Sequence, residues 1–420
     1  MNLSLFAHLF VAVTLALLAL GLLEDDGAPS VVAGLGGLVA AALVLYLPSP
    51  LMFFQNVWWP DLAGLPFYVS VLFLERTRRY PKLQMVLLFL GCLTGWLNFV
   101  LAMFLAGKRA LRREDRPSTA AIGSVVLSSL LLIALFELRH SSFSALWSKL
   151  LQRTGATGEY GSAWELFFLG FWGQTFKNFY GIAGLALLGG LCLVAFAYLY
   201  RRRARAEEAS SSFDLLFLAV TPMVTHAFFL RNHYVHHTYN TFKFAIPLAL
   251  LPPVLFRLLR QFSRFRLLPP VAAIGIPLVY LADQYPQYRA LNAVNQNLPA
   301  SDVEYAAFLR KYTGFSDVIF TSDQALEPAD PTYRVRSELV ALTNKNIWRA
   351  TDISQIRDFL RKALWRSVTP AACNVAVIGS LSNVRQFRYW KSFAAQKEAL
   401  SENGLFYLVR IDPQHYRTGI

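Results

Sequence analysis

Residues 225–256, THAFFLRNHYVHHTYNTFKFAIPLALLPPVLF, decide the architecture that the sequence predicts. Two apolar segments, at 213–230 and 243–259, meet there at a polar hinge. The hinge, residues 231–243, is rich in side chains that suit an anion; they are Arg231, Asn232, His233, His236, His237, Tyr239, Asn240 and Lys243. Arginine offers a planar fork of donors, lysine a point charge, and histidine a donor that can become cationic. The hinge therefore predicts a site for an anionic headgroup, with a lipid-linked phosphate as the first candidate.

The composition of the chain excludes an ordinary soluble globule. Of its 420 residues, 55% are hydrophobic and only 16% are charged. A bilayer is spanned by roughly 20 apolar residues in a helix, so several of the apolar segments are full spans and some are short. These segments lie at 3–23, 30–49, 61–75, 84–94, 96–106, 119–138, 179–200, 213–230, 243–259 and 267–282. The sequence predicts a mainly α-helical, polytopic membrane protein with the lipid bilayer as its first partner.

The net charge of +14 comes largely from clusters between these segments. Four stretches are basic, at 75–82, 108–116, 201–208 and 257–266. Short basic loops face the cytoplasm, and this topology explains the charge without a nucleic-acid partner. By the same parity, the acidic loop at 23–29 lies inside. The segment 139–178, the hinge and the amino terminus then lie outside, and 139–178 is expected to form helices in the plane of the interface.

The segment at 83–107, LQMVLLFLGCLTGWLNFVLAMFLAG, lies between the first two basic stretches. Its ends must return to the same side of the membrane, so we expect two half-helices with a break near Thr94 and Gly95. Such a break is tolerated where it is buried in protein or lines a cavity.

After Asp283 the apolar runs shorten and the charges become regular, so we divide the chain into a transmembrane domain, 1–283, and a soluble domain, 284–420. Four runs have strand character, at 317–322, 346–351, 374–381 and 404–412. Helical patterns alternate with them, at 301–314, 353–364 and 384–400. Ser301 and Glu304 form a capping box at the start of the first. We expect a small α/β domain outside the cytoplasm.

Three stretches resemble the multispanning glycosyltransferases of the C superfamily (GT-C fold), which take sugar from a polyprenyl-phosphate donor. They are SPLMFFQNVWWPDLAGLPFYVSVLFL at 49–74, the break around LTGW at 93–96, and HHTYNTFKFAIPLALLPPVLF at 236–256. The protein mannosyltransferase and aminoarabinose transferase types are similar to this pattern. The resemblance implies transfer of a polyprenyl-phosphate-linked sugar to an acceptor outside the cytoplasm. The composition and the lack of a eukaryotic retention signal favour a cell-envelope protein of the bacterial inner membrane, and the loop charges place the small α/β domain outside.

The resemblance and the composition of the hinge give the predicted substrate-binding residues, which are Arg231, His233, His236, His237, Tyr239, Lys243 and Asp61. Other interpretations stay open, because Arg231 and Lys243 can snorkel at helix ends and Asp61 can simply begin a helix. The HxxHH spacing at 233–237 also resembles the histidine box of di-iron membrane enzymes, which need several such boxes. No cofactor and no metal-ligand set are predicted, although the reaction is compatible with a divalent metal ion.

The catalytic residue is unknown. Sugar transfer needs a carboxylate that deprotonates the acceptor or holds a metal. In the similar family that carboxylate lies on a first outer loop, and the resemblance implies an alignment that begins at the family's second span, so we expect no counterpart of the first span and this loop. Glu24, Asp25 and Asp26 lie on the wrong face. The alternative function is a non-catalytic membrane subunit, or a remnant of the same fold, that packs with a second membrane subunit.

Overall fold

The chain forms two compact units, Met1–Ala293 and Val294–Ile420, and each is described by itself. The computed structural model describes residues 3–50, 60–111, 116–140, 143–154, 156, 163–205, 211–236, 238–262, 264–296, 307–313, 318–321, 347–349, 375–380, 395–400 and 406–411. The sequence places the boundary after Asp283, where the composition changes. Helix α15 (Leu268–Gln296) continues through that position.

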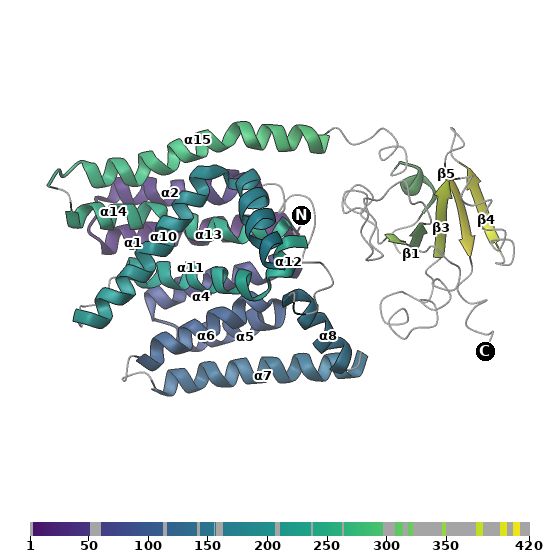
Figure 1. Ribbon diagram of the computed structural model, residues 1–420, viewed down its shortest axis with the longest axis horizontal. Helices are drawn as coiled ribbons and strands as arrows, with labels where there is room; N and C mark the ends of the chain where they lie inside the picture. Colours follow the sequence, from purple (N-terminus) through teal and green to yellow (C-terminus); the bar gives the residue numbers. More distant parts are fainter. Residues whose placement is uncertain are drawn as a thin grey trace. The chain divides into compact units, whose positions relative to one another are not determined.

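The first unit consists of helices over its described residues (Figure 1). Its amino-terminal half contains α1 (Leu3–Asp25), α2 (Ser30–Tyr46), α4 (Pro60–Thr77), α5 (Pro81–Thr94), α6 (Trp96–Leu111), α7 (Arg116–His140) and α8 (Phe143–Thr154). It continues with α9 (Ala163–Glu165), the π-helix η1 (Leu166–Phe176), α10 (Lys177–Arg205), α11 (Ser211–Phe229), α12 (Arg231–His236), the 3-10 helix η2 (Thr238–Phe244), α13 (Ala245–Ala249), α14 (Leu251–Phe262) and α15.

Five stretches of the described residues are long and apolar enough to cross a membrane; they are Ser4–Asp25, Ser118–Phe136, Leu166–Tyr198, Ser212–Phe229 and Asn240–Gln261. This confirms the prediction of a mainly α-helical, polytopic membrane protein. The stretches differ in burial. Protein covers 72% of Ser212–Phe229 and 78% of Asn240–Gln261, but only 11% of Ser118–Phe136. The hinge therefore joins the two most buried spans, whereas α7 lies at the periphery.

The predicted break between two half-helices is confirmed at Gly95. Helix α5 ends at Thr94, Gly95 is extended, and α6 begins at Trp96. The side chain of Asn98 is 1% exposed, and its Nδ2 donates a hydrogen bond to the Gly64 carbonyl oxygen at 3.1 Å. A Cβ atom on Gly91 would lie 2.8 Å from Asn98 Cγ, so glycine at this position admits the amide. Thr94, Gly95 and Trp96 are half-buried, so protein covers part of the break, which is where an interrupted helix is tolerated within a membrane.

The second unit contains a five-stranded sheet in the order β2-β1-β3-β5-β4. Its strands are β1 (Val318–Thr321), β2 (Ile347–Arg349), β3 (Val375–Ser380), β4 (Ala395–Leu400) and β5 (Phe406–Ile411). Strand β1 is parallel to β2 and β3, and β5 is antiparallel to β3 and β4. The four predicted strand runs are confirmed.

One prediction for this unit is wrong. The helix expected at 384–400 ends instead in strand β4, in which Leu400 pairs with Tyr407. Pairing with β5 outweighs the helical preference of AQKEAL, and lysine and glutamate, at 397 and 398, are residue types that suit the edge strand of a sheet. Residues 307–312 are helical as expected. Ser301, Glu304 and the helix predicted at 353–364 lie outside the described residues.

Candidate functional site

The hinge is built from short helices between α11 and α14. Helix α11 ends at Phe229, and α12, η2 and α13 follow within twenty residues. Proline at 247 and the pair at 252–253 keep α13 and the start of α14 apart, because proline removes a backbone donor and clashes with the preceding turn. The hinge and the residues after it therefore form consecutive short helices rather than one continuous helix.

Lys243 is buried in the hinge rather than snorkelling from it. Its side chain is 1% exposed, and Nζ donates a hydrogen bond to Asn240 Oδ1 at 2.7 Å. The same Nζ lies 5.5 Å from the ring centroid of Tyr234 and 5.9 Å from that of Phe242. The site thus contains a cation surrounded by aromatic rings, where a charge interacts more strongly than in water.

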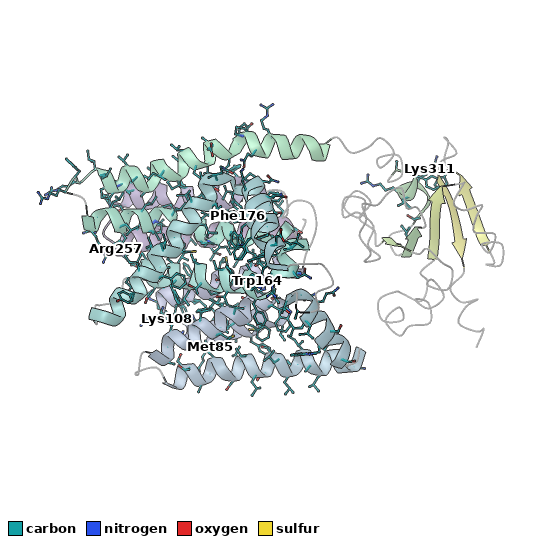
Figure 2. The ribbon with its side chains drawn as sticks, viewed as in Figure 1. Met85, Lys108, Trp164, Phe176, Arg257 and Lys311 are labelled. Carbon is teal, nitrogen blue, oxygen red and sulfur yellow. The ribbon has the colours of Figure 1, made fainter. Side chains whose placement is uncertain are left out.

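Arg231 begins α12 and is half-buried. Its Cζ lies 4.4 Å from the ring centroid of Trp164, which Figure 2 labels, in a cation–π contact. The Nε atom is buried and has no hydrogen-bond partner. Within the described part of the chain, no carboxylate forms an ion pair with Arg231. The contact with the Trp164 ring stabilises the guanidinium group but does not neutralise its positive charge.

Neutral hydrogen bonds hold the rest of the hinge. Asn232 Nδ2 donates to the Gln152 carbonyl oxygen in α8 at 2.7 Å, and Asn240 Nδ2 donates to that of His233 at 3.3 Å. The Tyr234 hydroxyl and His226 Nδ1 lie 2.9 Å apart. These contacts fix α12 and η2 against their neighbours, so the cations extend from an ordered backbone.

An aromatic wall of residues from η1 packs against the hinge. Phe167, Phe171 and Phe176 are fully buried. The ring centroids of Phe171 and Tyr234 are 5.1 Å apart, and those of Phe176 and Phe244 are 5.4 Å apart. The sequence places 139–178 in the plane of the membrane interface. Residues 166–176 pack instead against the hinge, because their phenylalanines bury more apolar surface there than at an interface.

A chain of hydroxyl groups connects the hinge to three other parts of the first unit. Ser49 Oγ lies 2.5 Å from Thr241 Oγ1, so the Ser-Pro pair at 49–50 reaches the hinge. The Tyr180 hydroxyl donates to the Thr241 carbonyl oxygen at 2.7 Å, and the Tyr280 hydroxyl donates to that of Tyr180 at 3.0 Å. The hinge is therefore tied to α10 and α15, which the sequence did not indicate.

For several predicted site residues, the whole residue or its side chain lies outside the part of the chain that the structure describes. His237 is outside the described residues, and so are the side chains of His236, Tyr239 and Asp61. The backbone at Asp61 is helical, one residue after the start of α4. In the described part of the chain, no group of three or more histidine, cysteine and acidic residues is arranged to hold a metal ion. Arg231, His233 and Lys243 are the described members of the predicted set.

The acidic loop at 23–29 lies with the basic stretches. Asp25 Oδ2 is 2.9 Å from Arg76 Nε, and Asp26 Oδ1 is 3.3 Å from Arg257 Nη1. Ser212 Oγ donates to Asp26 Oδ2 at 2.6 Å. Arg257 and Lys108, which belong to two basic stretches, lie at one end of the helices in Figure 2. These carboxylates serve ion pairs there, which agrees with their rejection as a catalytic base.

No protein-family model matches this chain, and no curated protein matches it. Among solved structures, the crystal structure of ArnT from Cupriavidus metallidurans in the apo state is similar. The match has 11% sequence identity and a TM-score of 0.43, and it covers 97% of this chain and 84% of that chain. A likeness at this level assigns neither a family nor an activity, so the function has to be inferred from the side chains of the hinge.

Proposed function

We propose that the hinge binds the phosphate of a polyprenyl-phosphate-linked sugar, and that the protein is a membrane glycosyltransferase-like protein that transfers this sugar to an acceptor outside the cytoplasm. The observation that carries the proposal is the guanidinium of Arg231. It is half-buried and stacked on Trp164, and its buried Nε has no hydrogen-bond partner. A buried donor without an acceptor costs free energy, which a phosphate oxygen would recover.

Two further groups support an anionic ligand. Lys243 supplies a second positive charge, buried in the same hinge. Trp172 lies in the aromatic wall, 5.3 Å from Phe244 between ring centroids, and its Nε1 is another buried donor without a hydrogen-bond partner. Phosphate oxygens are acceptors only, so they match cations and N–H donors better than a neutral ligand does.

The transfer breaks the bond between the anomeric carbon and the phosphate oxygen and forms a bond to an acceptor oxygen. Negative charge grows on the departing lipid phosphate, where Arg231 and Lys243 would stabilise it. The acceptor proton has to pass to a base. That base stays unassigned, and Asp61, His233, His236, His237 and Tyr239 stay predicted contacts to the sugar or the phosphate.

The test measures binding of a polyprenyl phosphate and of the corresponding neutral polyprenol to the detergent-purified protein. We expect the phosphate to bind more tightly. Arg231→Ala should weaken that binding by at least about tenfold, because a charge-assisted hydrogen bond contributes about 1.5–3 kcal/mol. Arg231→Lys should recover part of it, since the charge remains but the fork is lost.

Lys177→Ala is the matched control, because Lys177 is an exposed cation at the start of α10. Its affinity should stay within about twofold of the unchanged protein, as exposed charges contribute little. Equal binding of polyprenol and polyprenyl phosphate, or unchanged binding in Arg231→Ala, would remove the phosphate site. Binding without transfer of a lipid-linked sugar to any acceptor would support the non-catalytic alternative.

A further inference from the structure

Two buried acceptors stand out on α15. The side-chain oxygens of Gln284 and Gln287 are buried and have no hydrogen-bond partner. Gln284 is 0% exposed and Gln287 is half-buried. Residues three apart lie on the same face of a helix, so the two amides are neighbours. The Nε2 of Gln284 donates to Asp283 Oδ2 at 3.0 Å, which identifies the unpartnered atom as the oxygen.

The backbone of α10 is shaped to receive these two amides. Gly181 interrupts α10 with φ 68° and ψ 177°, a conformation that glycine adopts without the penalty of a side chain. A Cβ atom at this position would lie 2.9 Å from Gln284 Nε2 and 3.5 Å from Gln287 Nε2. Glycine at position 181 thus permits both the positive φ angle of the backbone and the close approach of the two amides.

This polar pair is connected to the hinge. The Tyr280 hydroxyl, one helical turn before Gln284, donates to the Tyr180 carbonyl oxygen, and the Tyr180 hydroxyl donates to that of Thr241. Thr241 is two residues from Lys243 in η2. The face of α15 that contains the two glutamines is therefore fixed relative to the backbone that positions the buried cation.

We propose that Gln284 and Gln287 form a subsite for hydroxyl groups, and that this subsite recognises the sugar of the lipid-linked donor. The proposal rests on the proposed function of the hinge and extends it. The chemistry of the unpartnered atoms differs between the two places. In the hinge and the aromatic wall beside it they are donors, Arg231 Nε and Trp172 Nε1, which match phosphate oxygens; on α15 they are acceptors, which match the O–H groups of a sugar.

A metal ion is a poorer match for the same acceptors. Calcium takes about 6–8 oxygen ligands, several of them carboxylates. In the described part of the chain, no cluster of three or more histidine, cysteine and acidic residues occurs, and Asp283 already accepts from Gln284. Neutral amide oxygens one helical turn apart are suited to two hydroxyl groups on one sugar ring.

The experiment compares two ligands on the detergent-purified full chain. One is a polyprenyl phosphate without sugar, and the other is the same lipid carrying a hexose, as polyprenyl-phosphate glucose and polyprenyl-phosphate mannose. Gln284→Met and Gln287→Met keep much of the side-chain volume and remove the acceptor. Tyr285→Phe, next to Gln284 but 60% exposed, is the matched control.

We expect the double variant to bind at least one sugar-linked lipid about tenfold more weakly than the unchanged protein does, because two hydrogen bonds to the sugar are lost. Its affinity for the sugar-free lipid should stay within about twofold. The single variants should show intermediate losses, and Tyr285→Phe none.

Three outcomes would overturn the subsite. Unchanged affinity for both hexose lipids in the double variant would remove it and leave the phosphate site standing. An equal loss of affinity for the sugar-free lipid would mean that the glutamines act on the lipid or on the fold. That outcome would also remove the sugar subsite. If the unchanged protein bound neither the sugar-free lipid nor the sugar-linked lipids, both the phosphate site at the hinge and the sugar subsite would be ruled out. Gln287→Met, at the half-buried position, keeps the test valid if the double variant does not fold.

Discussion

Two buried groups of charges in the first unit differ in how they are compensated. At the end of the helices that holds the basic stretches, Lys108 Nζ lies 3.0 Å from Glu75 Oε1 and 3.5 Å from Asp214 Oδ2. Arg109 Nη2 lies 2.8 Å from Glu75 Oε2 and donates to Gln84 Oε1 at 2.6 Å. In this ion-pair cluster, made of Glu75, Gln84, Lys108, Arg109 and Asp214, each cation meets a carboxylate. The cluster ties α4, α5, α6 and α11 together.

The charge of the arginine in the hinge is not compensated in this way. Arg231 stacks on Trp164, and within the described residues no carboxylate pairs with it. Arg257 provides the sharper contrast, because its Nε also lacks a hydrogen-bond partner, yet its Nη1 lies 3.3 Å from Asp26. An unpartnered nitrogen alone therefore does not indicate a ligand. The lack of charge compensation separates Arg231 from the structural arginines.

The largest expected effect is on stability, in the ion-pair cluster. Glu75→Ala removes the carboxylate shared by Lys108 and Arg109 and should destabilise the protein by about 3–5 kcal/mol, the usual cost of a buried charge that loses its partner. Thermal unfolding in detergent measures it. Glu24→Ala, at an exposed position, is the control and should change stability by less than about 0.5 kcal/mol. Equal stability of the two variants would show that the cluster is not a structural tie.

The next effect sharpens the contrast at Gly181. Gly181→Ala should destabilise the protein by about 1–3 kcal/mol, because alanine is strained at φ 68° and its Cβ meets Gln284. Gly189→Ala on the same helix has no neighbour within 4 Å, so it should be neutral or stabilising by up to about 1 kcal/mol. Chemical or thermal unfolding of both variants measures these changes in stability. Loss of stability at Gly189 alone would contradict the interrupted backbone of α10.

A smaller effect concerns the stacking of Arg231. Trp164→Leu removes the cation–π contact and should weaken polyprenyl-phosphate binding by about 0.5–2 kcal/mol, with little change in unfolding temperature. Phe229→Leu, at the exposed end of α11, is the control. If Trp164→Leu lowered the unfolding temperature without weakening polyprenyl-phosphate binding, Arg231 would have a structural role instead of a binding role.

The smallest effect is a pH dependence at Asp26, just beyond the span Ser4–Asp25. Burial raises the pKa of the Asp26 carboxyl above its usual value, against the hydrogen bond from Ser212 and the charge of Arg257. A raised pKa in the folded state means that its contribution to stability is complete below the unfolded pKa and is lost as pH rises through the folded pKa. Asp26→Asn should remove that loss, worth about 1 kcal/mol or less. Unfolding temperatures of both proteins between about pH 4 and 8 test it, and parallel curves would argue against it.

Much of the fold could be predicted from local patterns. The apolar segments, the break at Gly95 and four of the five strands follow from hydrophobic runs, loop charges and β-branched residues. Strand β4 could not be predicted, since its residues favour a helix until β5 is present as a partner. The hinge was also located from residue types, because three of the seven histidines gather there with Arg231 and Lys243.

Composition and spacing along the chain are enough to predict a polytopic membrane protein with a polar hinge between two apolar segments, since burying apolar side chains in a bilayer depends on these two properties alone. Only the tertiary structure decided which charges are compensated. Trp164 meets Arg231 across 67 positions of the chain, and Gly181 meets Gln284 across 103. Such contacts depend on how helices pack, and no periodicity along the chain records which side chains then lack a partner.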